Sequence, residues 1–176
     1  MTMAISLYDV TVLSYLQTLG GVAGFMERGL KHCGEKNVDP AEIVGTRLFS
    51  DMLPFSYQIN AVVGHSLGAI EGVKAGVITP PRKADGDYPA LQKLIADTIK
   101  ALEQIKPADI NSLEGKDVSF EMGDTKIPFT AEGYFLSFSL PNFHFHATTA
   151  YDILRTKGVA LGKRNYLGQL RMRAPA

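Results

Sequence analysis

Four stretches of this chain carry apolar residues at alternating steps of three and four, the spacing that puts them on one face of an α-helix. The stretches cover residues 12–30, 52–73, 91–105 and 131–157. A striped helix must bury its apolar face against another element, and helices joined by short links bury their faces against each other. The pattern therefore predicts a bundle of four long helices.

Residues that start and stop helices lie at the edges of these stretches. Asp39 followed by Pro40 is typical of an N-cap and a first helical position, so we expect a short helix there. Gly76 is expected to end the second long helix. Asp87 is expected to cap the third, and Pro107 to end it.

Before the fourth stretch the periodicity changes from that of a helix to that of a strand. Apolar and polar residues alternate on both sides of Gly123-Asp124, so residues 117–129 are predicted to form a β-hairpin. Pro128 cannot donate to a neighbouring strand, which makes the second strand an edge. The predicted fold is all-α, a single domain over 1–176, with this hairpin inserted before the last helix.

The fourth helix should be bent. Pro141 lies inside it, and the proline ring blocks the hydrogen bond to the Ser137 carbonyl one turn earlier. Gly158 is placed to stop the helix in a left-handed conformation. The residues that follow are rich in glycine and arginine without clear periodicity, so we expect an irregular tail.

Composition limits the partners. Lys+Arg and Asp+Glu number 18 each, so no overall charge draws the chain to nucleic acid or to an anionic membrane. Cys33 is the only cysteine, which excludes an intramolecular disulfide and favours a reducing compartment. No apolar run is long enough to span a membrane, and the N-terminus has no signal-peptide pattern. We expect a soluble, cytoplasmic protein.

His65 and His146 fall on two of the predicted long helices, and Asn142 lies one turn before His146. Residues four apart share a helix face, so Asn142 and His146 can point at one object. If the helix with His65 packs on that face, two imidazoles and an amide oxygen meet as in a metal site with one weak ligand. The alternative is that each histidine is an ordinary core or boundary residue. His144, about 200° away from His146, should face the outer or dimer-facing side.

The segment Gly64-His65-Ser66-Leu67-Gly68 matches G-x-S-x-G, the nucleophile elbow of α/β-hydrolases. That elbow requires a strained turn between a strand and a helix. Here the helical stripe continues through the motif, so a serine hydrolase using Ser66 is a minor alternative. We expect instead that Gly64 and Gly68 form a flat patch against which another helix packs.

Several strings of the chain resemble one family closely. They are Ile5-Ser6-Leu7-Tyr8-Asp9, the run 140–146 (LPNFHFH), the run 148–155 (TTAYDILR) and the run 158–164 (GVALGKR). They are similar to an uncharacterised bacterial branch of the DinB/YfiT-like superfamily of metalloenzymes. The resemblance spans essentially the whole chain. It implies an up-down-down-up four-helix bundle, commonly a homodimer.

The resemblance also implies a site. Superfamily members bind a divalent metal through one histidine on the second helix and an H-x-x-x-H pair on the last. His65 and His146 match two of these ligands, and Asn142 stands where the third histidine would be. The resemblance thus implies a zinc or nickel site formed by His65, His146 and Asn142, and a thiol-dependent transferase or isomerase of unknown substrate. The alternative is a non-catalytic bundle that binds a small molecule or only packs around the polar pocket.

Overall fold

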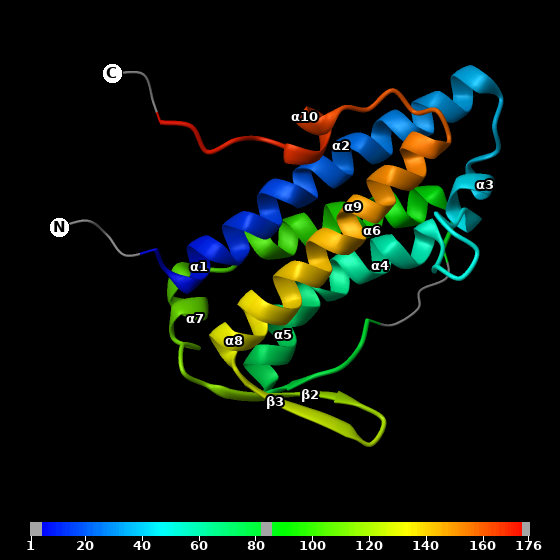
Figure 1. Cartoon of the computed structure of the whole chain (residues 1–176). Helices are drawn as coiled ribbons and strands as arrows, with labels where there is room; N and C mark the ends of the chain where they lie inside the picture. The colour runs from blue at the N-terminus through cyan, green and yellow to red at the C-terminus, as the bar shows by residue number, and fades with distance from the viewer. Residues whose placement is uncertain (1–4, 82–85, 174–176) are drawn as a thin grey trace.

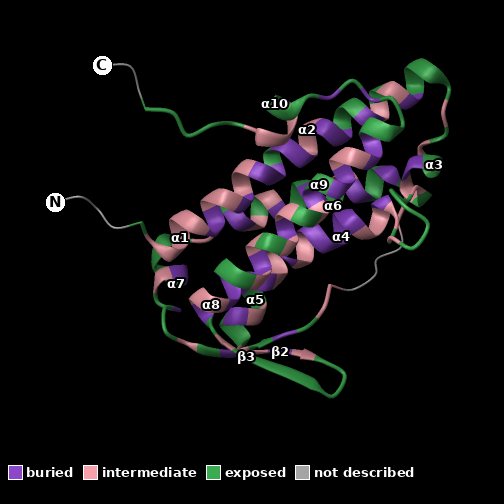
Figure 2. Cartoon of the chain, viewed as in Figure 1, coloured by how far each residue is buried: buried purple, intermediate pink, exposed green. Residues whose placement is uncertain are grey.

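The computed structural model describes residues 5–81 and 86–173 and is mostly helical, with a small three-stranded sheet at one end (Figure 1). In these residues no helix is long and apolar enough to cross a membrane. The buried faces of the long helices turn toward one another and form one continuous hydrophobic core (Figure 2).

The core is enclosed by long helical segments. They are α2 (Val12–Lys36), α4 (Phe55–Gly64) continued by α5 (Leu67–Ala75), α6 (Tyr88–Glu103) and α9 (Leu140–Thr156). α2 packs against α6 and α9, and α4 packs against the same two helices. α2 and α9 run in one direction along the molecule, whereas α4 and α6 run in the opposite direction (Figure 1).

The capping residues act as their sequence positions predict. The Asp39 carboxylate accepts a hydrogen bond from the Ala41 amide at the start of α3 (Pro40–Gly45), and Asp87 accepts one from Ala90 at the start of α6. Gly76 ends α5 in the left-handed conformation that glycine adopts without steric cost.

The prediction of one unbroken second helix is wrong. The helix stops at Gly64 and restarts at Leu67, with His65 and Ser66 in the turn between. The buried Ser66 hydroxyl donates to the Val62 carbonyl (2.8 Å) and lies 3.2 Å from that of Val63. A serine that bonds the preceding turn competes with the regular backbone ladder and bends the helix.

Pro107 does not end the third helix. α6 ends at Glu103, with Gln104 as its C-cap, and Pro107 instead begins the short helix α7 (Pro107–Asn111). Proline at a first helical position is favourable because its missing N–H would have no partner there. The sequence position of Pro107 allowed both roles.

The sheet has order β1-β2-β3. β2 (Asp117–Met122) and β3 (Thr125–Thr130) pair antiparallel around Gly123, and β3 with Pro128 is an edge strand. β1 (Val77–Ile78), directly after α5, adds a parallel strand on the other side of β2. A two-residue strand has too little alternation to be recognised from its sequence.

The last long segment contains a π-helical stretch. α8 (Ala131–Tyr134) leads into η1 (Phe135–Ser139), and α9 follows. In η1 the Leu140 amide bonds to the carbonyl of Phe135, five residues back rather than four. The wider turn comes immediately before Pro141, which has no amide hydrogen to donate to the preceding turn.

The tail is more ordered than its sequence indicates. It forms α10 (Lys163–Leu167), which lies along α2 (Figure 1). Gly21 of α2 makes this possible, because a Cβ there would come within 3.0 Å of the Asn165 carbonyl oxygen and closer still to that of Tyr166. The glycine-rich face of α2 thus receives a tail segment of the same chain.

Candidate functional site

His65 and His146 meet in the interior of the helical assembly. His65 lies in the turn between α4 and α5, and His146 lies in the middle of α9, which packs on α4. Their ring centroids are 5.6 Å apart and their ring planes are nearly parallel, at 7°. Two side chains that are far apart in the sequence therefore form one imidazole pair.

Gln58 orients one member of the pair. The buried Gln58 amide oxygen lies 2.7 Å from Nδ1 of His146, and its amide nitrogen donates to the Leu53 carbonyl (2.8 Å). Because the oxygen can only accept, Nδ1 of His146 carries the hydrogen and Nε2 keeps its lone pair. A metal-binding histidine is commonly fixed in this way, by a partner on the ring nitrogen that does not face the metal.

Aromatic rings surround the pair. The Phe138 ring centroid lies 6.0 Å from that of His65, and the Tyr57 and His146 rings meet edge to face with centroids 5.9 Å apart. In the described part of the chain the His65 ring makes such ring contacts but no hydrogen bond. Its nitrogens are therefore available to a ligand.

Burial keeps both imidazoles neutral. Loss of solvation lowers the pKa of His65 to about 4, and the neighbouring His146 contributes to this shift. Loss of solvation also lowers the pKa of His146 to about 4. A neutral imidazole is the form that binds a metal ion or accepts a proton.

The backbone of His65 is fixed from two other segments. The break in the second helix leaves the His65 carbonyl without its usual partner, and the buried Ser139 hydroxyl donates to it at 2.7 Å. Since the Ser139 hydrogen is used in this way, the Tyr15 hydroxyl, also at 2.7 Å, donates to Ser139 Oγ. Residues of α2 and η1 thus hold the turn that carries His65.

Asn142 shares its helix face with His146, but its amide nitrogen donates to the Phe138 carbonyl one turn earlier, at 2.8 Å. The group predicted as a weak third ligand is therefore engaged by its own helix through one end of its amide. The amide oxygen is the end that a metal would use.

His144 lies on the opposite side of α9 and does not contact the pair. Its Nδ1 is 3.1 Å from the Tyr166 hydroxyl of α10, and burial lowers its pKa. The expectation of an outer or dimer-facing residue needs correction, because the tail of the same chain covers this half-buried side chain.

The G-x-S-x-G segment lacks the geometry of a nucleophile elbow. Ser66 is fully buried in a turn between two helices, and its hydrogen goes to a backbone carbonyl. The predicted helix-packing role of the glycines also needs correction. A Cβ on Gly64 would meet the loop residue Pro81 at 2.7 Å, and one on Gly68 would meet only ordinary contacts.

Two site residues were not identified from the sequence, and helical spacing could have found both. Gln58 lies seven residues before His65, two turns along one face, and is a polar side chain in an otherwise apolar stripe. Ser139 stands in the same relation to His146. A polar residue on a buried helix face needs a partner, and that requirement is the missed signal.

The pair offers two imidazoles as donors to an ion. Within residues 5–81 and 86–173, no three His, Cys, Asp or Glu side chains gather where one metal ion could touch them all. Two imidazoles bound to one tetrahedral ion at about 2.1 Å would have ring centroids roughly 5 Å apart, close to the 5.6 Å between His65 and His146. The full three-ligand set of a catalytic zinc site is absent from these described residues, and the two nearly parallel rings would both have to lie in one plane with an ion for their lone pairs to reach it.

Comparisons with known proteins agree with this fold. The model of the family described as "Domain of unknown function (DUF1993)" matches residues 7–167. A solved structure of a DinB family member protein from Shewanella denitrificans superimposes with a TM-score of 0.79 at 24% sequence identity, covering 96% of each chain. No curated protein matches the chain. The fold is therefore DinB-like.

Proposed function

The chain belongs to the DUF1993 family, and from this premise we propose that it is a DinB-like protein that binds a divalent metal ion through His65 and His146. The helices α2, α4–α5, α6 and α8–α9 would form the up-down-down-up bundle of that superfamily. The observation that carries the proposal is the imidazole pair, with ring centroids 5.6 Å apart.

Three properties of the pair support metal binding. Both rings are neutral, so no proton has to leave before an ion binds. Gln58 holds the hydrogen of His146 on Nδ1 and leaves Nε2 as a donor. His65 makes no hydrogen bond within the described residues that a ligand would have to replace.

We propose zinc or nickel as the ion, since both accept neutral imidazole ligands. A bound ion would act as a Lewis acid and lower the pKa of a water or thiol in its shell, which is the chemistry that a thiol-dependent transferase or isomerase needs. The protein itself would supply the two imidazoles, the Gln58 orientation and a wall of aromatic rings that limits water. Asn142 would be a weak third group.

A second candidate is a non-catalytic bundle that binds a small polar molecule at the same pair without metal. The hydrogen bond from Asn142 to the Phe138 carbonyl favours it, because the amide that replaces the third histidine serves its own helix. In this version Nε2 of His146 accepts a hydrogen bond from the bound molecule.

Calorimetric titration with zinc and nickel tests the first candidate, together with elemental analysis of protein purified without an affinity tag. We expect modest affinity in the wild-type protein and none in His65→Ala or His146→Ala. His144→Ala is the matched control, because that imidazole lies on the other face of α9 and should leave the affinity unchanged. If the wild-type protein binds neither metal, or if His144→Ala loses binding as well, the metal proposal fails and the second candidate stands.

We also propose that the protein is cytoplasmic and that it forms a homodimer. The sole cysteine, Cys33, is buried and fits a reducing compartment.

The dimer is proposed from the surface. Large apolar side chains remain exposed among the described residues, including Phe49 and Phe145, and a second copy of the chain would cover them. Light scattering should give twice the mass of the chain, and a concentration-independent monomer would exclude the dimer.

A further inference from the structure

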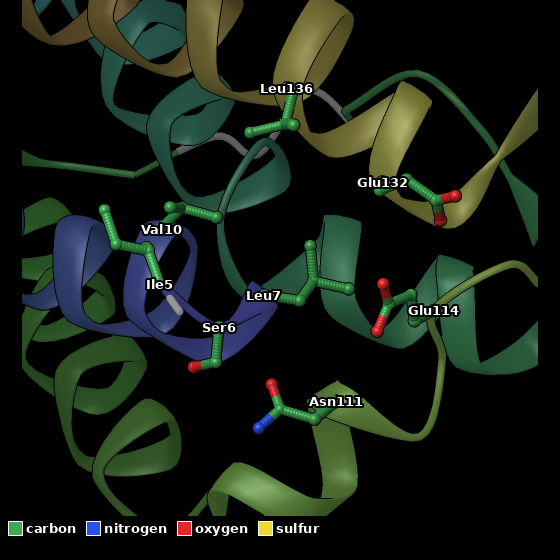
Figure 3. Close-up of a pocket in the computed structure, with 8 residues that line it drawn as sticks. All are labelled: Ile5, Ser6, Leu7, Val10, Asn111, Glu114, Glu132 and Leu136. Atoms are coloured by element: carbon green, nitrogen blue, oxygen red, sulfur yellow. The ribbon is translucent and has the colours of Figure 1, made fainter. Parts of the chain in front are cut away.

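A cavity lies beside α1, near the first described residues of the chain. It has a volume of about 560 Å³ and opens where α1 (Leu7–Val10) meets α7 and the α8–η1 segment (Figure 3). This volume lies within the range of small-molecule sites, roughly 300–1,000 Å³. The histidine pair does not line it, so the cavity is separate from the proposed metal site.

One part of the cavity wall is apolar. Leu7 and Val10 come from α1, and Leu136 comes from η1. Leu136 is 52% exposed and adds apolar surface to this part of the wall. A ligand with an apolar body would remove this surface from water.

The other part of the wall is acidic. Glu114 and Glu132 line the cavity and lie on the same side of it in Figure 3, and no Lys, Arg or His is among its described lining residues. Within the part of the chain that the structure describes, neither carboxylate has an ion-pair partner. Two uncompensated negative charges beside one cavity attract a cation.

The polar part of the wall is held in place before any ligand arrives. The Gly115 amide donates to Oε2 of Glu132 at 2.9 Å, and this bond lowers the pKa of that carboxyl, so it is ionised at neutral pH. The Tyr8 amide donates to the side-chain oxygen of Asn111 at 2.9 Å. The Thr130 side chain also hydrogen-bonds the Glu132 carboxylate and contributes to its lower pKa. Fixed groups of this kind lower the ordering cost of binding.

We propose that this cavity binds an organic ammonium ion with a short apolar body. The ammonium group would lie between the carboxylates of Glu114 and Glu132, and the apolar body would cover Leu7, Val10 and Leu136. The charge selects a cation over a carboxylate, and the apolar wall selects an alkyl or aryl amine over a small inorganic ion.

Hexylamine is the probe. Three matched ligands test its features: hexan-1-ol lacks the charge, hexanoate reverses the charge, and methylamine lacks the apolar body. Binding is followed by amide shifts in ¹H–¹⁵N spectra of the full chain, which also report on folding. Hexylamine should shift amides around Val10, Asn111 and Leu136 and bind more tightly than the other three. Equal binding of hexan-1-ol, or shifts elsewhere in the chain, would overturn the proposal.

Two variants test whether the carboxylates of Glu114 and Glu132 bind the ammonium group. Glu114→Gln and Glu132→Gln should each weaken hexylamine binding about fivefold, since each removes one of the two carboxylates that would contact the ammonium group. In Glu132→Gln the new side-chain amide oxygen would still accept the Gly115 amide hydrogen, so the wall should keep its shape. Glu103→Gln is the control, an exposed residue at the end of α6 that does not line the cavity, and should change nothing. Unchanged affinity in both cavity variants would overturn the assignment.

Discussion

The two faces of α9 carry the same residue type in opposite circumstances. His146 faces α4, where it meets another imidazole and the Gln58 amide. His144, two residues earlier, faces the tail and bonds to the Tyr166 hydroxyl of α10. Burial lowers the pKa of both rings, so burial alone does not distinguish them.

The difference lies in what stands beside each ring. On the tail face, Tyr166 uses the Nδ1 of His144 and completes a contact within the chain. On the α4 face, Gln58 uses Nδ1 of His146 and leaves Nε2 available beside a neighbouring imidazole that has no hydrogen bond within the described residues. A histidine is a candidate ligand when its partner fixes one nitrogen and the fold places a second donor beside the ring, as His65 stands beside His146.

The largest effect we expect comes from adding a third imidazole to the α4 face. Asn142→His restores the H-x-x-x-H spacing with His146 and replaces a weak amide donor by a strong one. Metal affinity should rise about a hundredfold, because three imidazoles complete the protein ligand set of a zinc site. Titration calorimetry measures the gain. If neither the wild-type protein nor Asn142→His binds metal, the pair is not a metal site.

Lowering the pH should reduce the free energy of unfolding more through the imidazole pair on the α4 face of α9 than through His144 on the tail face. The pKa of both His65 and His146 is about 4 in the folded chain against 6.5 for an ordinary histidine, so the unfolded chain binds more protons between these values. Stability is therefore full above pH 6.5 and is lost as pH falls toward 4, by on the order of 2 kcal/mol for the pair after allowing for solvent screening.

Urea unfolding at a series of pH values measures this loss. His65→Gln and His146→Gln should flatten the pH dependence between 6.5 and 4, and His144→Gln should flatten it less. The same pKa values predict that metal affinity persists below the usual histidine range and falls near pH 4. If stability and metal affinity both change most steeply near pH 6.5, the imidazole pair is open to solvent.

Gln58→Leu removes the hydrogen bond to His146 and should affect the α4 face of α9 alone. Without the amide oxygen, the hydrogen of His146 can move from Nδ1 to Nε2, and metal affinity should fall about tenfold, as it does when other partners of ligating histidines are removed. ¹⁵N chemical shifts of His146 report the change of tautomer directly, with or without metal. Gln104→Leu, on an exposed cap, is the control. Unchanged nitrogen shifts in Gln58→Leu would remove Gln58 from the site.

Periodicity and capping residues predicted most of the helices because both are local properties of the sequence. Asp39, Asp87 and Gly76 each act at the end where their chemistry is useful. The opposite orientation of His144 and His146 likewise follows from helix geometry alone. None of these predictions needed knowledge of a partner far away in the chain.

The features of the site and of the tail that escaped prediction depend on distant partners. The break at His65 leaves a carbonyl that Ser139 satisfies from another helix, and the tail is ordered because Gly21 gives it room on α2. The orientation of His146 depends on Gln58, which is 88 residues away in the sequence. The spacing of His65 and His146 placed both residues on helices, but only the packing of α4 on α9 brought their rings together.

The smallest expected effect on the imidazole pair comes from the tail face. Tyr166→Phe removes the hydroxyl that bonds His144 and Thr148 and should cost about 2 kcal/mol in the free energy of unfolding, roughly 1 kcal/mol for each hydrogen bond. Tyr151→Phe is the matched control, a half-buried tyrosine whose ring meets that of Tyr166 and whose hydroxyl makes no side-chain bond within the described residues. Urea unfolding measures both variants. Metal affinity should be the same in both, because the His144 side of α9 supplies nothing to the imidazole pair. If Tyr166→Phe weakens metal binding, the tail and the site are coupled through α9, and the two faces cannot be treated as independent.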